Sequence, residues 1–221
     1  MYDHLAAVSP SYFDSGWYLD VVRFAQQTPW LHGAAKIYTI GGFVVLALLL
    51  LAGGLLARHS DARSAAAALA APIGVLGAFA VNEIVKAAVR EIRPCDTMHV
   101  TATVLPCDPV TDFSFPSNHT AVAVALAVAL LLVHRKLGWV AVPFALLMGL
   151  SRVYVGAHYP HDVLAAIVVG TAVALLVGLL AMRLLAAPVA KLRPGSLGWL
   201  LGPGEAPPQH AHAARRTAAH N

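Results

Sequence analysis

The sequence contains five long apolar segments, separated by short stretches that carry most of the charged residues. An apolar helix needs about 20 residues to cross the hydrocarbon core of a bilayer, and each segment is close to that length. A soluble helical bundle is disfavoured, because its helices would be apolar on one face only. We therefore predict an all-α, polytopic membrane bundle with the crossings Tyr38–Ala57, Ala65–Val89, Ser117–Val133, Leu137–Tyr154 and Val163–Leu185.

Composition agrees with this class. Hydrophobic residues make up 58% of the 221 residues and charged residues only 12%, about half of the roughly 25% that is usual in soluble domains. The net charge of +4 does not indicate nucleic-acid binding, because the basic residues lie in short clusters and no aromatic-basic face accompanies them. The expected partners are therefore membrane lipids and a lipid substrate, without nucleic acid; oligomeric state has no signal in the sequence.

The chain divides by composition into an N-terminal extracytoplasmic segment (1–37), a membrane domain (38–187) and a C-terminal tail (188–221). The tail is rich in Pro, Gly, Ala and His, which predicts a disordered cytoplasmic segment. Its histidines lack the spacing of metal ligands.

An amphipathic pattern covers Asp14–Pro29, which is too polar to cross a membrane. Its apolar positions recur at helical spacing, opposite Asp20 and Gln26, and predict an interfacial helix on the outer leaflet. Aromatic residues at such positions are typical of anchors at the membrane interface. The apolar positions are Trp17, Tyr18, Val21, Phe24 and Ala25.

Lysine and arginine in the loops predict the orientation, since loops rich in these residues stay in the cytoplasm. The first end of the predicted bundle, including the tail, carries Arg58, Arg63, Arg135, Lys136, Arg183, Lys191, Arg193, Arg215 and Arg216. The other end carries Arg23, Lys36, Arg90, Arg93 and Arg152. The first end is predicted to be cytoplasmic, so the N-terminus lies outside and the C-terminus inside the cell.

Three basic residues follow each other at the outer end of the second crossing. Lys86, Arg90 and Arg93 are spaced i, i+4 and i+7 and share one helix face. A charged side chain at membrane depth is costly, so it pairs with another group or lines a wet cavity. For Arg90, the extension of its side chain to the interface is an equal alternative. Lys86 offers a point charge, whereas Arg93 offers a planar fork that matches two phosphate oxygens.

The motif Pro116-Ser117-Asn118-His119 stands directly before the third apolar segment. Ser117 or Asn118 can cap the helix that begins there, which leaves free backbone N–H groups and the positive end of the helix dipole facing the loop. Such a helix start suits an anion.

The third motif is Ser151-Arg152-x5-His158-x3-Asp162. Pro160 is expected near the first position of the fifth helix, so His158 and Asp162 lie about one turn apart. A carboxylate at that distance can accept the Nδ1 proton of His158 and direct Nε2 toward phosphorus. His161 has no counterpart in the motif and is interpreted as a rim residue.

Together these three motifs resemble the type-2 phosphatidic acid phosphatase superfamily, over roughly residues 82 to 162. The resemblance implies that His158 is the nucleophile and forms a phosphohistidine, that Asp162 orients it, and that His119 protonates the leaving oxygen. It implies no metal and no cofactor. The implied phosphate-binding residues are Lys86, Arg93, Ser117, Asn118 and Arg152. The usual Gly of the second motif is replaced here by Asn118, one of the few residues that tolerate a positive φ.

Longer strings around the second and third motifs, Phe115–Thr120 and Ser151–Pro160, are similar to undecaprenyl-diphosphate phosphatases of the bacitracin-resistance type. This likeness implies a polyprenyl diphosphate substrate, cleaved at the outer face of a bacterial cell membrane to recycle the cell-wall carrier lipid. The alternative is a glycerophospholipid phosphatase acting on phosphatidate or phosphatidylglycerophosphate. A soluble vanadate-dependent haloperoxidase is disfavoured by the five crossings, and a non-catalytic membrane protein or transporter would not need both histidines and Asp162.

The chain has two cysteines, Cys95 and Cys107, and both lie in the loop between the first and second motifs. This loop is predicted to face the oxidising side of the membrane, where disulfides form and persist. Two unrelated thiols are the alternative. We predict a disulfide that restrains the connection between Arg93 and Ser117.

Overall fold

The computed structural model describes residues 13–203, and this part of the chain is helical without strands. The elements are α2 (Ser15–Gln27), the short 3-10 helix η1 (Pro29–Leu31), α3 (His32–Ala57), α4 (Ala62–Val89), α5 (Pro94–Thr97), α6 (Asn118–Val133), α7 (Arg135–Tyr154), α8 (Pro160–Leu184), α9 (Ala186–Leu192) and α10 (Gly198–Leu201). The predicted all-α class is confirmed, and the five predicted crossings correspond to α3, α4, α6, α7 and α8.

The long helices have the surface of a membrane protein. Four spans, Pro29–Ala57, Ala62–Thr97, Arg135–Tyr154 and Pro160–Leu184, are long and apolar enough to cross a bilayer, and Asn118–Val133 is a shorter apolar helix. Large aliphatic side chains lie exposed along them, such as Leu51 at 60% and Leu76 at 67%. Water would oppose so much exposed apolar surface, whereas lipid tails accommodate it. The chain is therefore a multi-pass membrane helical bundle.

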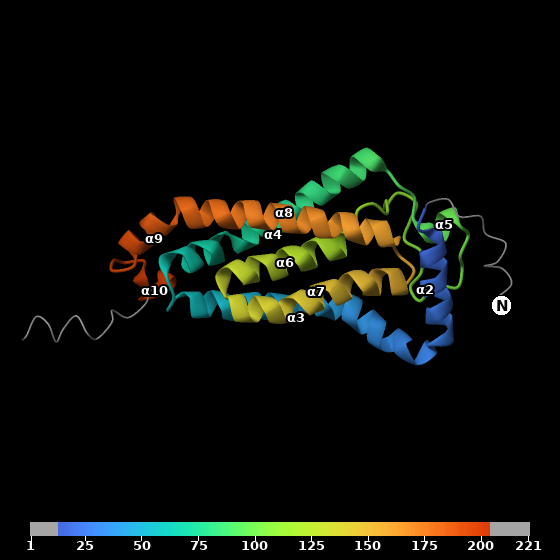
Figure 1. Cartoon of the computed structure of the whole chain (residues 1–221), viewed down its shortest axis with the longest axis horizontal. Coiled ribbons are helices and arrows are strands. Elements are labelled where there is room, and N and C mark those ends of the chain that lie inside the picture. Colours follow the sequence, from blue (N-terminus) through green and yellow to red (C-terminus); the bar gives the residue numbers. More distant parts are fainter. Residues whose placement is uncertain (1–12, 204–221) are drawn as a thin grey trace, which may run out of the picture.

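Helix α6 lies at the centre of the bundle, where it contacts α3, α4, α7 and α8 (Figure 1). Its alanines let the neighbouring backbones come close, as is usual between membrane helices. One close approach is at Gly170 in α8, where an added Cβ would lie 2.4 Å from the backbone oxygen of Ala121. Short small-residue contacts of this kind fix α8 against α6.

The buried face of α4 carries the first motif into the protein. Small residues occupy this face through most of the helix, including Ala71, Gly74 and Ala78, and the same face continues into Asn82 and Lys86. Because residues three or four apart share a helix face, the packing that buries the small residues also turns Lys86 inward. Arg90 ends the helix in a left-handed conformation and is exposed.

The ends that carry the three motifs lie together at one end of the bundle (Figure 1). The last turns of α4 and α7 and the first turns of α6 and α8 meet there, beside α2, α5 and the loop that leads to α6. Helix α2 lies across this end at the predicted position. Its Tyr18, Val22 and Ala25 are buried, and the Tyr18 hydroxyl donates to the Gly156 oxygen at 3.0 Å. Trp17 is 65% exposed, so the predicted apolar face is divided between protein contacts and the outer surface.

The predicted disorder of the tail does not hold for its first part. Residues 188–203 include most of α9 and all of α10, and Arg193 donates to the backbone oxygen of Ser60 at 2.8 Å. These contacts fold the segment back onto the loop between α3 and α4, a long-range pairing that composition does not encode. The remainder of the predicted tail, 204–221, lies outside the described residues, as do residues 1–12 of the N-terminal segment.

Candidate active site

The three motifs meet around one cavity of about 380 Å³. Six of the predicted catalytic and phosphate-binding residues line it: Lys86, Arg93, Asn118, His119, Arg152 and His158. Two further predicted residues, Ser117 and Asp162, are fully buried behind this wall. The loop after α5 contributes Leu105, Pro106, Cys107, Asp108, Pro109 and Asp112, and Ala157 completes the lining.

His158 is held by the carboxylate of Asp162, as its spacing predicts. The Nδ1 atom of His158 lies 3.2 Å from Oδ2 of Asp162, and the same oxygen accepts hydrogen bonds from the backbone N–H of Tyr159 at 2.8 Å and from the Ser114 hydroxyl. An ionised carboxylate only accepts, so Nδ1 carries the proton and Nε2 keeps its lone pair. Nε2 lies 3.3 Å from Nη1 of Arg93, which donates to it.

The environment of His158 favours its neutral form. Its side chain is only 2% exposed. Burial, together with the charges of Arg93 and Arg152, holds the pKa of His158 well below its usual value. A neutral imidazole with an unprotonated Nε2 beside a cavity is the state that a nucleophile requires.

Lys86 and Arg93 are bridged by a carboxylate that motif analysis did not identify. Asp112 accepts from Lys86 Nζ at 3.0 Å through Oδ1 and from Arg93 Nη2 at 2.9 Å through Oδ2. Asp108 lies on the same guanidinium at 3.2 Å. Burial alone would raise the pKa of Asp112, but the hydrogen bond from Lys86 and the charge of Arg93 outweigh it and lower the pKa below its usual value. Two carboxylates thus lie on the cations that would bind a phosphoryl group.

Arg152 enters the cavity from α7 and is only 5% exposed. Its Nη1 donates to the Thr39 hydroxyl of α3 at 3.0 Å. Its buried Nε has no hydrogen-bond partner in the described part of the chain. A guanidinium at a cavity wall suits an anion, because it offers several N–H donors and a fixed positive charge.

The start of α6 places its three polar residues differently. Ser117 is the N-cap, and its hydroxyl oxygen accepts from the N–H of Thr120 at 3.4 Å, so this side chain serves the helix and does not line the cavity. Asn118 has a right-handed helical backbone and accepts from Asn82 Nδ2 at 2.7 Å. The positive φ that would explain Asn in place of Gly is therefore absent at this position. His119 lines the cavity and packs against the ring of Phe43. A role for Ser117 in holding phosphate stays a prediction.

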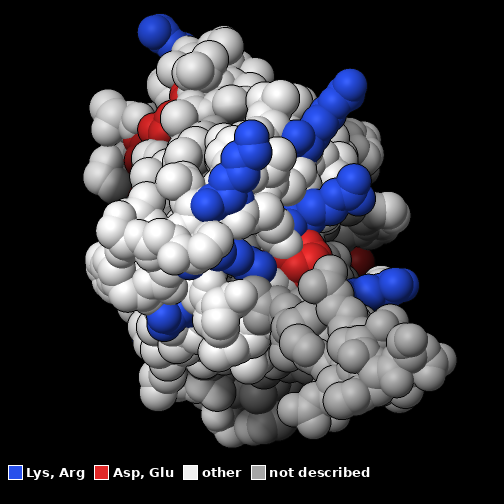
Figure 2. Space-filling view, turned by 90° about the vertical axis from the view of Figure 1, so that its left-hand side faces the viewer, with Lys and Arg blue, Asp and Glu red and all other residues white. Residues whose placement is uncertain are grey.

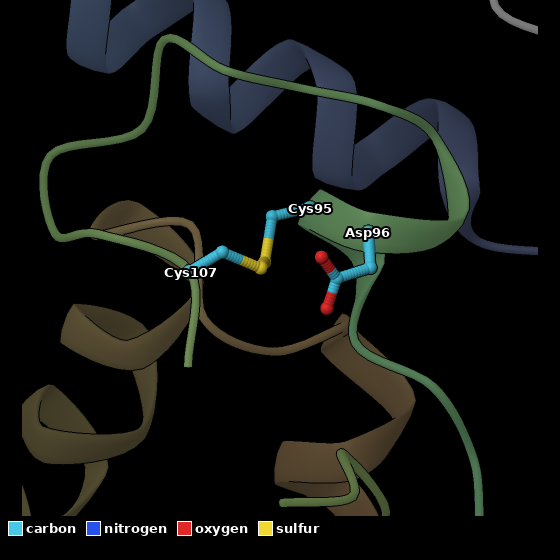
Figure 3. Close-up of side chains that lie close together, drawn as sticks. All are labelled: Cys95, Asp96 and Cys107. Atoms are coloured by element: carbon cyan, nitrogen blue, oxygen red, sulfur yellow. A yellow bond between two sulfur atoms is a disulfide. The ribbon is translucent and has the colours of Figure 1, made fainter. Parts of the chain in front are cut away.

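A disulfide joins Cys95 in α5 to Cys107, with their Cα atoms 6.0 Å apart (Figure 3). Figure 3 shows the Asp96 carboxylate beside the two sulfur atoms. Cys107 directly precedes Asp108 in the chain. The disulfide therefore restrains the loop segment from which Asp108 and Asp112 reach the cations of the cavity. The contact of Asp108 and Asp112 with the cations could have been predicted from one feature of the sequence: both acidic residues lie in a loop between two motifs that carry cations.

Two further basic residues, Arg90 and His161, do not line the cavity. For Arg90, the sequence allowed either a place in a wet cavity or extension of the side chain to the membrane interface. The side chain is exposed and does not line the cavity. His161 is not at a rim: its side chain is only 14% exposed and lies between the carboxylates of Asp14 and Glu91.

Comparison with known proteins agrees with the motifs. The chain is 39% identical over 140 residues to the undecaprenyl-diphosphatase BcrC of Bacillus subtilis, a match that covers 63% of this chain and 67% of that protein. It is 36% identical over 95 residues to an undecaprenyl-diphosphatase of Sulfolobus acidocaldarius, covering 42% of this chain and 45% of that protein.

A third relative is the decaprenylphosphoryl-5-phosphoribose phosphatase of Mycobacterium tuberculosis, 35% identical over 111 residues, which are 49% of this chain and 58% of that protein. Solved structures give no match. The model of the PAP2 superfamily matches residues 65–184, more than half of the chain and the whole of α6, α7 and α8. This match includes all three motifs, and the chain belongs to the PAP2 superfamily.

Proposed function

We propose that this protein is an integral-membrane lipid phosphatase that hydrolyses a polyprenyl diphosphate, such as undecaprenyl diphosphate, to the monophosphate. The observation that carries the proposal is the neutral His158, held by Asp162 and facing a cavity lined with Lys86, Arg93 and Arg152. Two relatives named undecaprenyl-diphosphatase support the diphosphate substrate.

In the first step, Nε2 of His158 attacks the terminal phosphorus in line. A P–N bond forms while the P–O bond to the lipid monophosphate breaks, and His119 gives a proton to the departing oxygen. The buried cations hold the negative charge on the equatorial oxygens, where preorganised donors contribute most. Asp162 accepts the Nδ1 hydrogen bond and stabilises the positive charge that develops on the ring.

In the second step, His119 takes a proton from a water molecule, which attacks the phosphorus of the phosphohistidine. The P–N bond breaks, inorganic phosphate leaves, and His158 returns to its neutral form.

The cavity is proposed to open on the extracytoplasmic side, which fits recycling of a cell-wall carrier lipid. The opposite end of the bundle supports this orientation, because Lys and Arg side chains project from it (Figure 2). Loops rich in these residues remain in the cytoplasm.

The test is phosphate release by the purified protein in detergent from undecaprenyl diphosphate, phosphatidate and phosphatidylglycerophosphate, measured side by side. We expect the highest kcat/KM with the diphosphate. A higher value with either glycerophospholipid would replace this assignment by the alternative named above, and no release from any of the three would overturn the proposal.

Variants of the two histidines test the mechanism in the same assay. His158→Ala is expected to show no turnover and no acid-labile, base-stable phosphoenzyme. His119→Ala should slow the reaction by about 10²- to 10⁴-fold, the contribution typical of a general acid. Ordinary turnover by the His158→Ala protein would exclude it as the nucleophile.

A further inference from the structure

His161, in the first turn of α8, lies between carboxylates from two other segments. Its Nδ1 is 2.9 Å from Oδ1 of Asp14, at the start of α2, and its Nε2 is 3.1 Å from both carboxylate oxygens of Glu91, which follows α4. The backbone N–H of His161 also donates to Asp14 Oδ2 at 2.7 Å. The side chains of Asp14 and Glu91 are 1% and 7% exposed.

This arrangement suits a proton on both ring nitrogens. A neutral imidazole has one N–H, whereas an imidazolium has two, and ionised carboxylates can only accept. With a carboxylate at hydrogen-bonding distance from each nitrogen, His161 is satisfied as a cation. A buried carboxylate without a counter-charge would be costly, so the cation in turn stabilises Asp14 and Glu91.

The same cation lies beside the residue that orients the nucleophile. His161 Nε2 is 3.5 Å from Oδ1 of Asp162, and the Asp162 side chain is fully buried. A carboxylate oxygen of Glu91, a carboxylate oxygen of Asp162 and a ring nitrogen of His161 all lie within 4.8 Å of one another. Two carboxylates this close disfavour each other's ionised form unless a positive charge compensates.

We propose that His161 is a positioning residue for the reaction: as an imidazolium it compensates the negative charges of Asp162 and Glu91, and so keeps Asp162 an acceptor for the His158 Nδ1 proton. Through Asp14 it also fixes α2 against the catalytic pair. This inference rests on the proposed function, since it assigns a role within that same mechanism.

A metal ion is the competing interpretation, because Glu91, His161 and Asp162 offer three ligand atoms close together. The ring geometry favours the cation. Both ring nitrogens already lie at hydrogen-bond distances from carboxylate oxygens, whereas a ligating nitrogen would keep one of them for the ion.

Charge rescue tests the inference in detergent-purified protein. His161→Gln should lower kcat by about 10- to 100-fold, the loss usual when a hydrogen-bonding group behind a functional residue is removed. The KM should change by less than about twofold, because His161 does not line the cavity. Adding Glu91→Gln to His161→Gln removes the carboxylate that repels Asp162, and should restore most of the lost kcat. The exposed His59, at the other end of the bundle, supplies the matched control as His59→Gln.

Failure of Glu91→Gln to restore any rate, in a double variant that unfolds at the temperature of the wild type, would overturn the inference. So would a rate that a chelator abolishes and a divalent metal restores. If His161→Gln does not fold, Glu91→Gln alone decides: the inference expects nearly normal kcat, and a loss as large as that of Asp162→Asn contradicts it. Wild-type turnover in the same preparations tests the proposed function separately.

Discussion

The two ends of the bundle use the same basic residue types in opposite environments. At the cavity end, Lys86, Arg93 and Arg152 are 6%, 3% and 5% exposed. At the other end, Arg135, Lys136 and Arg183 are exposed. A buried cation acts at short range in a low dielectric, whereas an exposed one is screened by water and salt. The two ends therefore differ in the burial of their charges and not in their number. The buried cations can hold a phosphoryl group, whereas the exposed ones only indicate which end faces the cytoplasm.

The largest effect expected from this comparison is a difference in labelling from outside the cell. In a Cys95→Ser/Cys107→Ser background, Thr111→Cys at the cavity end should react fully with a membrane-impermeant thiol reagent in intact cells. Ser60→Cys at the other end should react only after the membrane is permeabilised. The reverse pattern would place the cavity in the cytoplasm and remove the carrier-recycling assignment.

A matched pair of charge removals separates the two ends by rate. Arg93→Gln should lower kcat/KM by about 10²- to 10³-fold, the cost of removing one preorganised donor from a charged transition state. Arg135→Gln should change it by less than about twofold, because an exposed charge interacts weakly. Phosphate release measures both, and equal losses would contradict the assignment of the buried cations to catalysis.

The disulfide at the cavity end is expected to stabilise the folded protein. Cys95→Ser/Cys107→Ser should lower the free energy of unfolding by up to about 3 kcal/mol, since the bond restricts a short loop in the unfolded chain. Thermal unfolding in detergent measures the difference. Intact-mass analysis after alkylation without reductant is the accompanying check, and two alkylated cysteines in the freshly purified wild type would show that the bond does not form.

The smallest expected effect concerns Asp112, which lies on the cations and is 47% exposed. Asp112→Asn should lower KM by about two- to fivefold, because an ion pair at such a site is worth roughly 0.2–1 kcal/mol and substrate must displace it. A higher KM would instead assign Asp112 to substrate binding.

The effect of Asp112 should not depend on pH in the neutral range. Its pKa is lowered in the folded protein, so the carboxylate stays ionised and its ion pairs are lost only as the pH falls through that lowered value. We expect the ratio of the wild-type KM to the Asp112→Asn KM to be constant from about pH 5 to about pH 8 and to approach one only below about pH 4. Steady-state kinetics across this range measure the ratio.

The sequence predicted the helices better in their apolar centres than at their ends. Helix α3 begins at His32, before the predicted crossing that starts at Tyr38, whereas α8 begins at Pro160, as the sequence predicted from the proline. The additional turns of α3 contain polar residues, such as Lys36, which hydropathy assigns to loops. A helix continues as long as its backbone hydrogen bonds form, whatever the polarity of its last turn.

Local spacing alone determined much of this protein: five apolar segments specified a membrane bundle, and the i, i+4 spacing of His158 and Asp162 specified their contact. Only the tertiary structure decided which polar groups face the cavity. Asp112 came onto Lys86 and Arg93, and His161 joined Asp14 and Glu91. These contacts join residues from about 19 to 147 positions apart. Sequence patterns report periods of two to four residues, whereas the direction of a loop side chain depends on which distant segment packs against it.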